Sequence, residues 1–269
     1  MASSNPAFTN SPAFSTRAGT SLATTATGGM TAAELDELYA RPSATAAQTD
    51  RMSYEDVIVK IVVSFAILIA GAVVGWFMPV LMLPALIVGF VLAMVNIFKK
   101  KPSPALVLSY AAVEGVFVGA ISGLFATMWE GIVPQAVFGT LGVVGVTLAL
   151  FASGKVRASK KATQVVMVAM VGYLVFSVIN MILMMTGATS GMFGLRSFEI
   201  FGIPLGFFIG VLVIVMAAYS LVLDFTTIKT GVERGAPRVY GWTAAFGIMV
   251  TVVWLYLEIL RLLAILRES

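Results

Sequence analysis

Seven apolar runs, each about 20 residues long, follow one another from Val57 almost to the end of the chain. An α-helix needs about 20 residues to cross the hydrocarbon core of a bilayer. The runs cover residues 57–77, 81–98, 105–128, 133–152, 164–185, 205–228 and 241–265. Charged residues make up only 11% of the chain, which is too few for a soluble domain. We therefore predict an all-α integral membrane protein with a bundle of seven transmembrane helices.

The first 52 residues differ from the rest, because Ala, Ser, Thr, Asn, Gly and Pro dominate them. Such a composition is typical of a disordered segment. Within it, Thr31 and Glu34 have the spacing of a helix capping box, and they precede Leu35 and Leu38 on one side of a short helix. We predict a disordered cytoplasmic tail over residues 1–52, with no cleavable signal peptide, and a transmembrane domain over residues 53–269.

Basic residues fall in alternate loops between the runs, which indicates the orientation of the chain. They are Lys99, Lys100 and Lys101, then Lys155, Arg157, Lys160 and Lys161, then Lys229, Arg234 and Arg238. By the positive-inside rule these loops and the N-terminus are cytoplasmic. Arg196 is the one base in the remaining loops, whereas Arg261 and Arg267 near the C-terminus conflict with the assignment. A re-entrant final segment is therefore an alternative to a seventh span.

The residues that the chain lacks exclude several classes of function. It contains no Cys and no His, so disulfides, thiolate nucleophiles, Ser-His hydrolases and His-ligated zinc proteases are impossible. We expect no enzymatic activity, no bound cofactor and no structural metal. The surplus of Lys and Arg lies in loops beside the membrane, which gives no reason to expect a nucleic-acid partner.

Glycines spaced four apart recur in the apolar runs and predict close contacts between helices. They are Gly71 and Gly75, then Gly115, Gly119 and Gly123, then Gly202, Gly206 and Gly210.

Three acids lie within or at the edge of the runs, although only seven acidic residues follow residue 56. They are Glu114, Asp224 and Glu258. A carboxylate in hydrocarbon costs roughly 2.5 to 3.5 kcal/mol on insertion scales, so it faces a partner or a water-filled path. Asp224 and Glu258 lie on the last two runs; if they approach each other in a dry site they share one proton and form a pH switch. The different depths of the two acids in the membrane oppose this pairing. A helix that starts at Gly241 places Glu258 about 25 Å along its axis, far from an Asp224 near the cytoplasmic face.

Other interpretations of these acids remain open. Asp224 is close to Lys229 and is alternatively an interfacial acid in a solvated vestibule. Arg261 follows Glu258 by three residues, so the two side chains share a helix face and are able to form a static pair. Glu114 is alternatively a buried acid hydrogen-bonded to Ser109 or Ser122.

Two segments carry a family resemblance: SLVLDFTTIK over residues 220–229 and WLYLEILRLL over residues 254–263. They resemble the paired signatures of the Bax inhibitor-1 family, also called YccA-like or transmembrane Bax-inhibitor-motif proteins. FMPVLMLP over residues 77–84 and the Lys99–Lys101 turn are similar to its bacterial YetJ calcium leak channel branch. The likeness spans about residues 57–266. Glu258 replaces the usual Asp, and Val88 stands where that branch has an acid.

The resemblance implies a pH-regulated Ca²⁺ leak channel in the bacterial plasma membrane. It implies that Asp224 and Glu258 are the pH-sensing pair on the ion path, with Lys99 at the position of a basic latch; Lys99 or Arg261 is then the counter-ion. Glu114 is an additional membrane acid without a counterpart. Two alternatives are a regulatory protein that binds and restrains another membrane complex, such as a protease, and a cation/proton exchanger. The expected partners are the lipid bilayer, Ca²⁺ or another cation, and in the second case a membrane protein.

Overall fold

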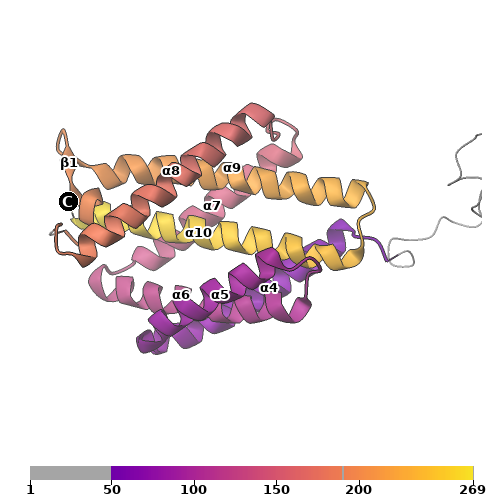
Figure 1. The fold of residues 1–269 in the computed structure, drawn as a ribbon, viewed down its shortest axis with the longest axis horizontal. Helices are drawn as coiled ribbons and strands as arrows, with labels where there is room; N and C mark the ends of the chain where they lie inside the picture. Colours follow the sequence, from indigo (N-terminus) through magenta and orange to yellow (C-terminus); the bar gives the residue numbers. More distant parts are fainter. Residues whose placement is uncertain (1–49, 190, 269) are drawn as a thin grey trace, which may run out of the picture. The chain divides into compact units, whose positions relative to one another are not determined.

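The computed structural model describes residues 50–189 and 191–268. Seven helices in these ranges are long and apolar enough to cross a membrane, as predicted (Figure 1). They are α4 (Tyr54–Phe77), α5 (Met82–Phe98), α6 (Pro104–Met128), α7 (Ile132–Ala152), α8 (Lys160–Met185), α9 (Leu205–Glu233) and α10 (Gly241–Glu268). Short 3₁₀ turns lie at η1 (Pro79–Leu81), η2 (Gly194–Ser197) and η3 (Arg238–Tyr240).

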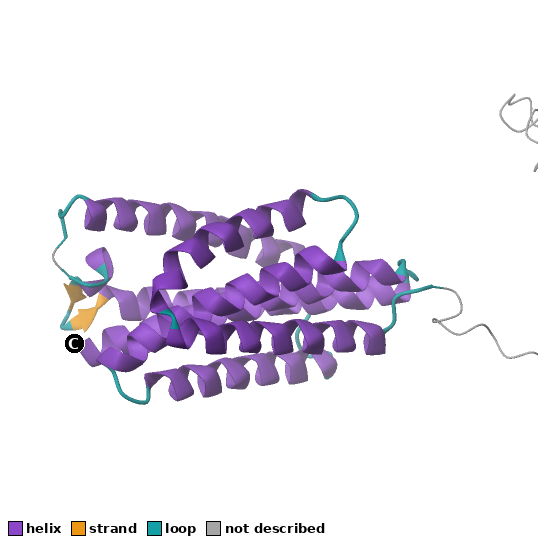
Figure 2. Ribbon diagram, turned by 90° about the horizontal axis from the view of Figure 1, so that it is seen from below, coloured by secondary structure: helices purple, strands orange, loops and turns teal. Residues whose placement is uncertain are grey.

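The two ends of the bundle differ in their loops. One end, here called the basic end, carries the start of α4 and loops 99–103, 153–159 and 234–240 (Figure 1). The opposite end carries η2 and the hairpin of β1 (Glu199–Ile200) and β2 (Ile203–Pro204), and α10 ends there (Figure 2). The segment between α8 and α9 is therefore folded at the end where the loops are almost free of basic residues.

Local capping explains where α8 begins. The Ser159 side chain accepts a hydrogen bond from the Ala162 backbone N–H at 3.2 Å. This cap satisfies one of the free amides of the first turn, so the helix begins at Lys160, four residues before the predicted start of the span.

Helix α10 is the most buried of the described helices, and it packs against α9, α4, α7 and α6 (Figure 1). Leu221 of α9 and Met249, Leu255 and Leu260 of α10 have essentially no exposed surface. Because α10 is one continuous helix of 28 residues, the structure does not support the alternative of a re-entrant final segment.

Glycines hold α4 and α6 together; their spacing predicted close helix contacts but not which helices pair. The prediction was wrong for Gly202, which lies in the turn between β1 and β2, where a Cβ would meet nothing within 4 Å. A Cβ atom at Gly115 would collide with the carbonyl oxygen of Leu68, and one at Gly119 would collide with that of Ala72. On α9, a Cβ at Gly210 would lie 2.9 Å from Leu262 Cδ1 of α10. The α4 and α6 backbones therefore approach within contact distance, which is how small residues stabilise helix pairs in lipid, whereas at Gly210 the neighbour is a side chain.

The chain just before α4 lies against the loop between α9 and α10. The Met52 N–H donates to the Ala236 carbonyl at 2.7 Å, and the Arg238 N–H donates to the Asp50 carbonyl at 2.9 Å. The Met52 side chain is buried. The rest of the predicted tail, with its capping motif at Thr31 and Glu34, lies outside the described residues.

Candidate functional site

Glu258 lies at the centre of a polar cluster, in the half of the bundle that is farther from the basic end. Only 2% of its surface is exposed. Arg261 Nη1 donates to Glu258 Oε1 at 2.6 Å, and Arg196 Nη1 lies 3.5 Å from Oε2. The Tyr173 hydroxyl also donates to Oε1. We call Tyr173, Arg196, Glu258 and Arg261 the Glu258 cluster; it joins α8, η2 and α10.

Tyr173 links the two arginines within this cluster. Its hydroxyl accepts from Arg196 Nη2 at 2.6 Å and from Arg261 Nη1 at 3.2 Å while it donates to Glu258. The Arg196 guanidinium also lies 5.3 Å from the centre of the Tyr173 ring. The cluster therefore compensates the charge of a buried carboxylate with two guanidiniums and a neutral donor.

Sequence reasoning found Arg261 but missed Arg196 and Tyr173. Arg196 lies 62 positions before Glu258 and is brought to it by η2. Asn180 holds this turn, because its Oδ1 accepts from the Leu195 N–H at 2.7 Å and its Nδ2 donates to the Phe193 carbonyl at 3.2 Å. One signal was available: Arg196 is the only basic residue in loops otherwise free of Lys and Arg.

Asp224 lies in a different environment, in the half of α9 toward the basic end. Its Oδ2 accepts a hydrogen bond from Thr251 Oγ1 at 2.7 Å. Within the described part of the chain Asp224 forms no ion pair, and the nearby Lys229 pairs with the exposed Glu233 at 3.7 Å. Asp224 lines a cavity of about 320 Å³ whose walls include Met52, Gly231 and Tyr240.

The structure does not bring Asp224 and Glu258 together. No hydrogen bond joins them within residues 50–189 and 191–268. Thr251, the partner of Asp224, precedes Glu258 by seven residues, which is about 10.5 Å along a helix. The expected proton-sharing pair is therefore absent from this conformation, and the reason is the depth difference that a helix starting at Gly241 imposes.

The remaining predicted residues lie apart from both acids. Lys99 caps the end of α5, where it is exposed, and it forms no ion pair with any described residue. Glu114 is half-buried on α6, close to Tyr110 and facing Gly89 of α5. Ser122 is not a partner of Glu114, because its hydroxyl bonds to the Val118 carbonyl and to Tyr256, each at 2.6 Å.

A lysine that the sequence analysis did not single out ties the basic end together. Lys60 of α4 is only 7% exposed, and it donates to the Asp56 carboxylate and to the Arg238 carbonyl, the latter at 2.6 Å. Arg238 Nε in turn donates to Asp56 Oδ1 at 2.7 Å. This network fixes the start of α4 to η3 and so supports one wall of the region around Asp224.

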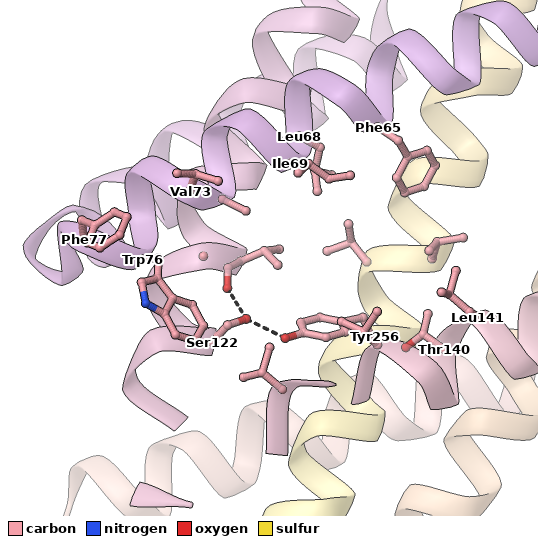
Figure 3. A pocket seen from close by; sticks show the side chains of 17 residues that line it. Phe65, Leu68, Ile69, Val73, Trp76, Phe77, Ser122, Thr140, Leu141 and Tyr256 are labelled. Carbon is pink, nitrogen blue, oxygen red and sulfur yellow. Dashed lines mark hydrogen bonds between the residues drawn. The ribbon is translucent and has the colours of Figure 1, made fainter. Parts of the chain in front are cut away.

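A separate cavity is apolar and lies between α4, α6, α7 and α10 (Figure 3). Its volume is about 380 Å³, and Phe65, Trp76 and Leu141 are among its lining residues. Figure 3 shows Ser122 and Tyr256 hydrogen-bonded to each other at its floor, so these polar groups are satisfied within the protein. Its lining contains no carboxylate and no basic side chain, in contrast to the cavity that Asp224 lines.

Comparison with known proteins assigns the family. No curated protein matched the sequence at a significant level. A family model described as Bax inhibitor 1 like matches residues 5–268, which is nearly the whole chain. The seven apolar helices agree with a family of multi-span membrane proteins. The chain is therefore a multi-pass membrane protein that belongs to the Bax inhibitor-1-like family.

Proposed function

We propose that this protein is a pH-regulated cation leak channel and that Ca²⁺ is the ion it passes. The observation that carries the proposal is the environment of Asp224: a half-buried carboxylate inside a membrane protein, with one neutral partner, facing a cavity at the basic end. An acid in a membrane helix without a basic partner is a functional-site candidate. The family match and the resemblance to calcium leak channels agree with this assignment.

In the proposed mechanism, ionised Asp224 attracts a cation into the cavity at the basic end. Protonation at lower pH removes this charge and with it the attraction, so cation flux falls as the pH is lowered. Thr251 positions the carboxylate. Because cation selection depends on this charge, the proposed pH response needs no carboxylate pair.

We assign this structure to the closed conformation of the proposed channel. Leu221 of α9 and Met249 and Val253 of α10 are buried in the core of the bundle. Toward the opposite end, the Glu258 cluster carries two guanidiniums against one carboxylate and repels a cation. Opening therefore requires the apolar core and the Glu258 cluster to rearrange.

The proposal also includes the location of the protein. We place it in the bacterial plasma membrane with the basic end on the cytoplasmic side. The support is the distribution of basic residues among the loops and the resemblance to bacterial members of the family. The absence of His and Cys from the whole sequence favours transport over catalysis.

Calcium flux into proteoliposomes tests the proposal. The wild-type protein is expected to admit Ca²⁺ faster than protein-free vesicles at pH 8, and Asp224→Asn is expected to lower that rate at least about tenfold. Glu233→Gln is the matched control, because it removes an exposed acid from the same helix. Equal flux through wild type and Asp224→Asn, or no flux above that of protein-free vesicles, contradicts the proposal.

The same vesicles separate a leak from the alternative of strict cation/proton exchange. A leak moves Ca²⁺ only down its own electrochemical gradient. Uphill Ca²⁺ movement driven by an imposed proton gradient would instead identify an exchanger.

A further inference from the structure

The Glu258 cluster forms one wall of a cavity of about 520 Å³ between α8, η2 and α10. Ser177 and Asn180 add polar groups to the lining. Met185, the last residue of α8, also lines the cavity, so the cavity extends to the end of that helix. The cavity is therefore polar at its base and reaches toward the membrane surface at the opposite end of the bundle.

The charges around this cavity do not balance. Arg196 is only 4% exposed, and two thirds of the Arg261 side chain is covered, since its exposure is 33%. Glu258 supplies one negative charge against these two positive charges. The nearest acids along the chain, Glu199 and Glu268, are exposed and form no ion pair with either arginine within the described residues. One buried positive charge is left without a counter-charge, which is costly in a membrane protein.

Hydrogen-bond donors are also left over at the same place. The Ser177 hydroxyl oxygen is buried and has no hydrogen-bond partner among the described residues. Every hydrogen bond that Arg261 makes to a described residue uses Nη1, so its Nε and Nη2 groups are available. Ser177 follows Tyr173 by one helical turn, which puts both side chains on the same face of α8.

We propose that this cavity binds one oxyanion, a phosphate or carboxylate group held by Arg261 and Ser177 beside Arg196. Guanidinium groups bind such planar or tetrahedral oxyanions through charge-assisted hydrogen bonds. A single negative charge balances the surplus positive charge of the cluster, whereas a cation would add to it. The anion is either a free solute or the phosphate of an anionic lipid, since the cavity reaches the end of α8. The charge surplus and the unused donors that carry this proposal are present whether or not the protein passes cations.

Thermal unfolding of the full-length protein in an uncharged detergent tests the site, with inorganic phosphate compared with chloride at equal ionic strength. Saturating phosphate is expected to raise the Tm of the wild type by about 5 °C. Ser177→Glu places a carboxylate in the cavity; it is expected to raise the Tm in chloride and to remove the response to phosphate. Arg261→Gln is expected to remove the response as well.

Arg267→Gln is the matched control, because Arg267 lies on the same helix but binds the Glu130 carbonyl and Gln135 outside the cavity. This variant is expected to keep the full response to phosphate. A full response in Ser177→Glu, or loss of the response in Arg267→Gln, overturns the proposed location.

Native mass spectrometry distinguishes the two sources of the anion. Protein extracted from vesicles of phosphatidylglycerol and phosphatidylcholine is expected to retain one phosphatidylglycerol in the wild type and none in Ser177→Glu if the anion is a lipid headgroup. Stabilisation by phosphate without a retained lipid supports a free solute. The proposal is overturned if phosphate does not stabilise the protein and no lipid is retained.

Discussion

Asp224 and Glu258 lie on adjacent helices and differ in almost everything that surrounds them. Glu258 is buried and is held by two arginines and a tyrosine. Asp224 is half-buried, has the hydroxyl of Thr251 as its hydrogen-bond partner and faces a cavity at the basic end. A carboxylate whose charge is compensated inside the protein is suited to holding helices together. One that faces a cavity without a basic partner is suited to meeting a proton or a cation.

The largest expected effect is on stability, and it distinguishes the two acids. Among the described residues Glu258 is the one acid paired with the buried Arg196 and the partly buried Arg261, so Glu258→Gln is expected to lower the free energy of unfolding by about 3 to 5 kcal/mol. Asp224→Asn is expected to change it by less than about 1 kcal/mol, because the amide still accepts from Thr251. Denaturant unfolding in mixed micelles measures both values. Equal losses would show that the two acids are not in different environments.

Removing the second arginine is expected to have the next largest effect. Arg196→Gln leaves Glu258 paired with Arg261 alone and loses the bonds to the Glu258 carboxylate and the Tyr173 hydroxyl. The expected loss of unfolding free energy is about 2 kcal/mol. Arg267→Gln is the control, because Arg267 is exposed. This variant should lose less than about 0.5 kcal/mol of unfolding free energy. An Arg196 variant as stable as this control would remove Arg196 from the cluster.

Tyr173→Phe tests the hydroxyl that connects the cluster. The ring remains while one donor and its two acceptor contacts are lost, so the expected loss is about 1 to 1.5 kcal/mol. The pH dependence of Ca²⁺ flux should be unchanged, because this tyrosine has no contact with Asp224. A flux profile altered as strongly as that of an Asp224 variant would instead couple the two sites.

Thr251→Val is expected to have the smallest effect on stability and a specific effect on flux. It removes the hydrogen bond that Asp224 accepts from Thr251 Oγ1, at a cost of about 1 kcal/mol or less. The ionised carboxylate then loses a stabilising donor, so the midpoint of the pH–flux curve should move to higher pH. Thr226→Val is the control, because among the described residues the Thr226 hydroxyl bonds to the Val222 carbonyl of its own helix and not to Asp224. The same shift in both variants would contradict the assigned role of Thr251.

Features that depend on nearby residues could be predicted from the sequence. The seven spans follow from run length, the close helix contacts at Gly115 and Gly119 from glycine spacing, and the Glu258–Arg261 pair from a separation of three residues on a helix. Arg196 could not be placed, because its contact with Glu258 depends on how η2 folds between α8 and α9. The expected contact between Asp224 and Glu258 depended on the relative depth of two helices, which short-range patterns do not determine.

The pH dependence of Ca²⁺ flux in two variants tests the central claim most directly, which is that Asp224 and Glu258 are separate sites with separate roles. One variant is Asp224→Asn. The other is the double variant Glu258→Gln with Arg196→Gln, which removes one charge of each sign and leaves the net charge of the cluster unchanged. Proteoliposome flux should lose its pH dependence in Asp224→Asn and retain it in the double variant. A pH-dependent Asp224→Asn together with a pH-independent double variant would contradict the claim.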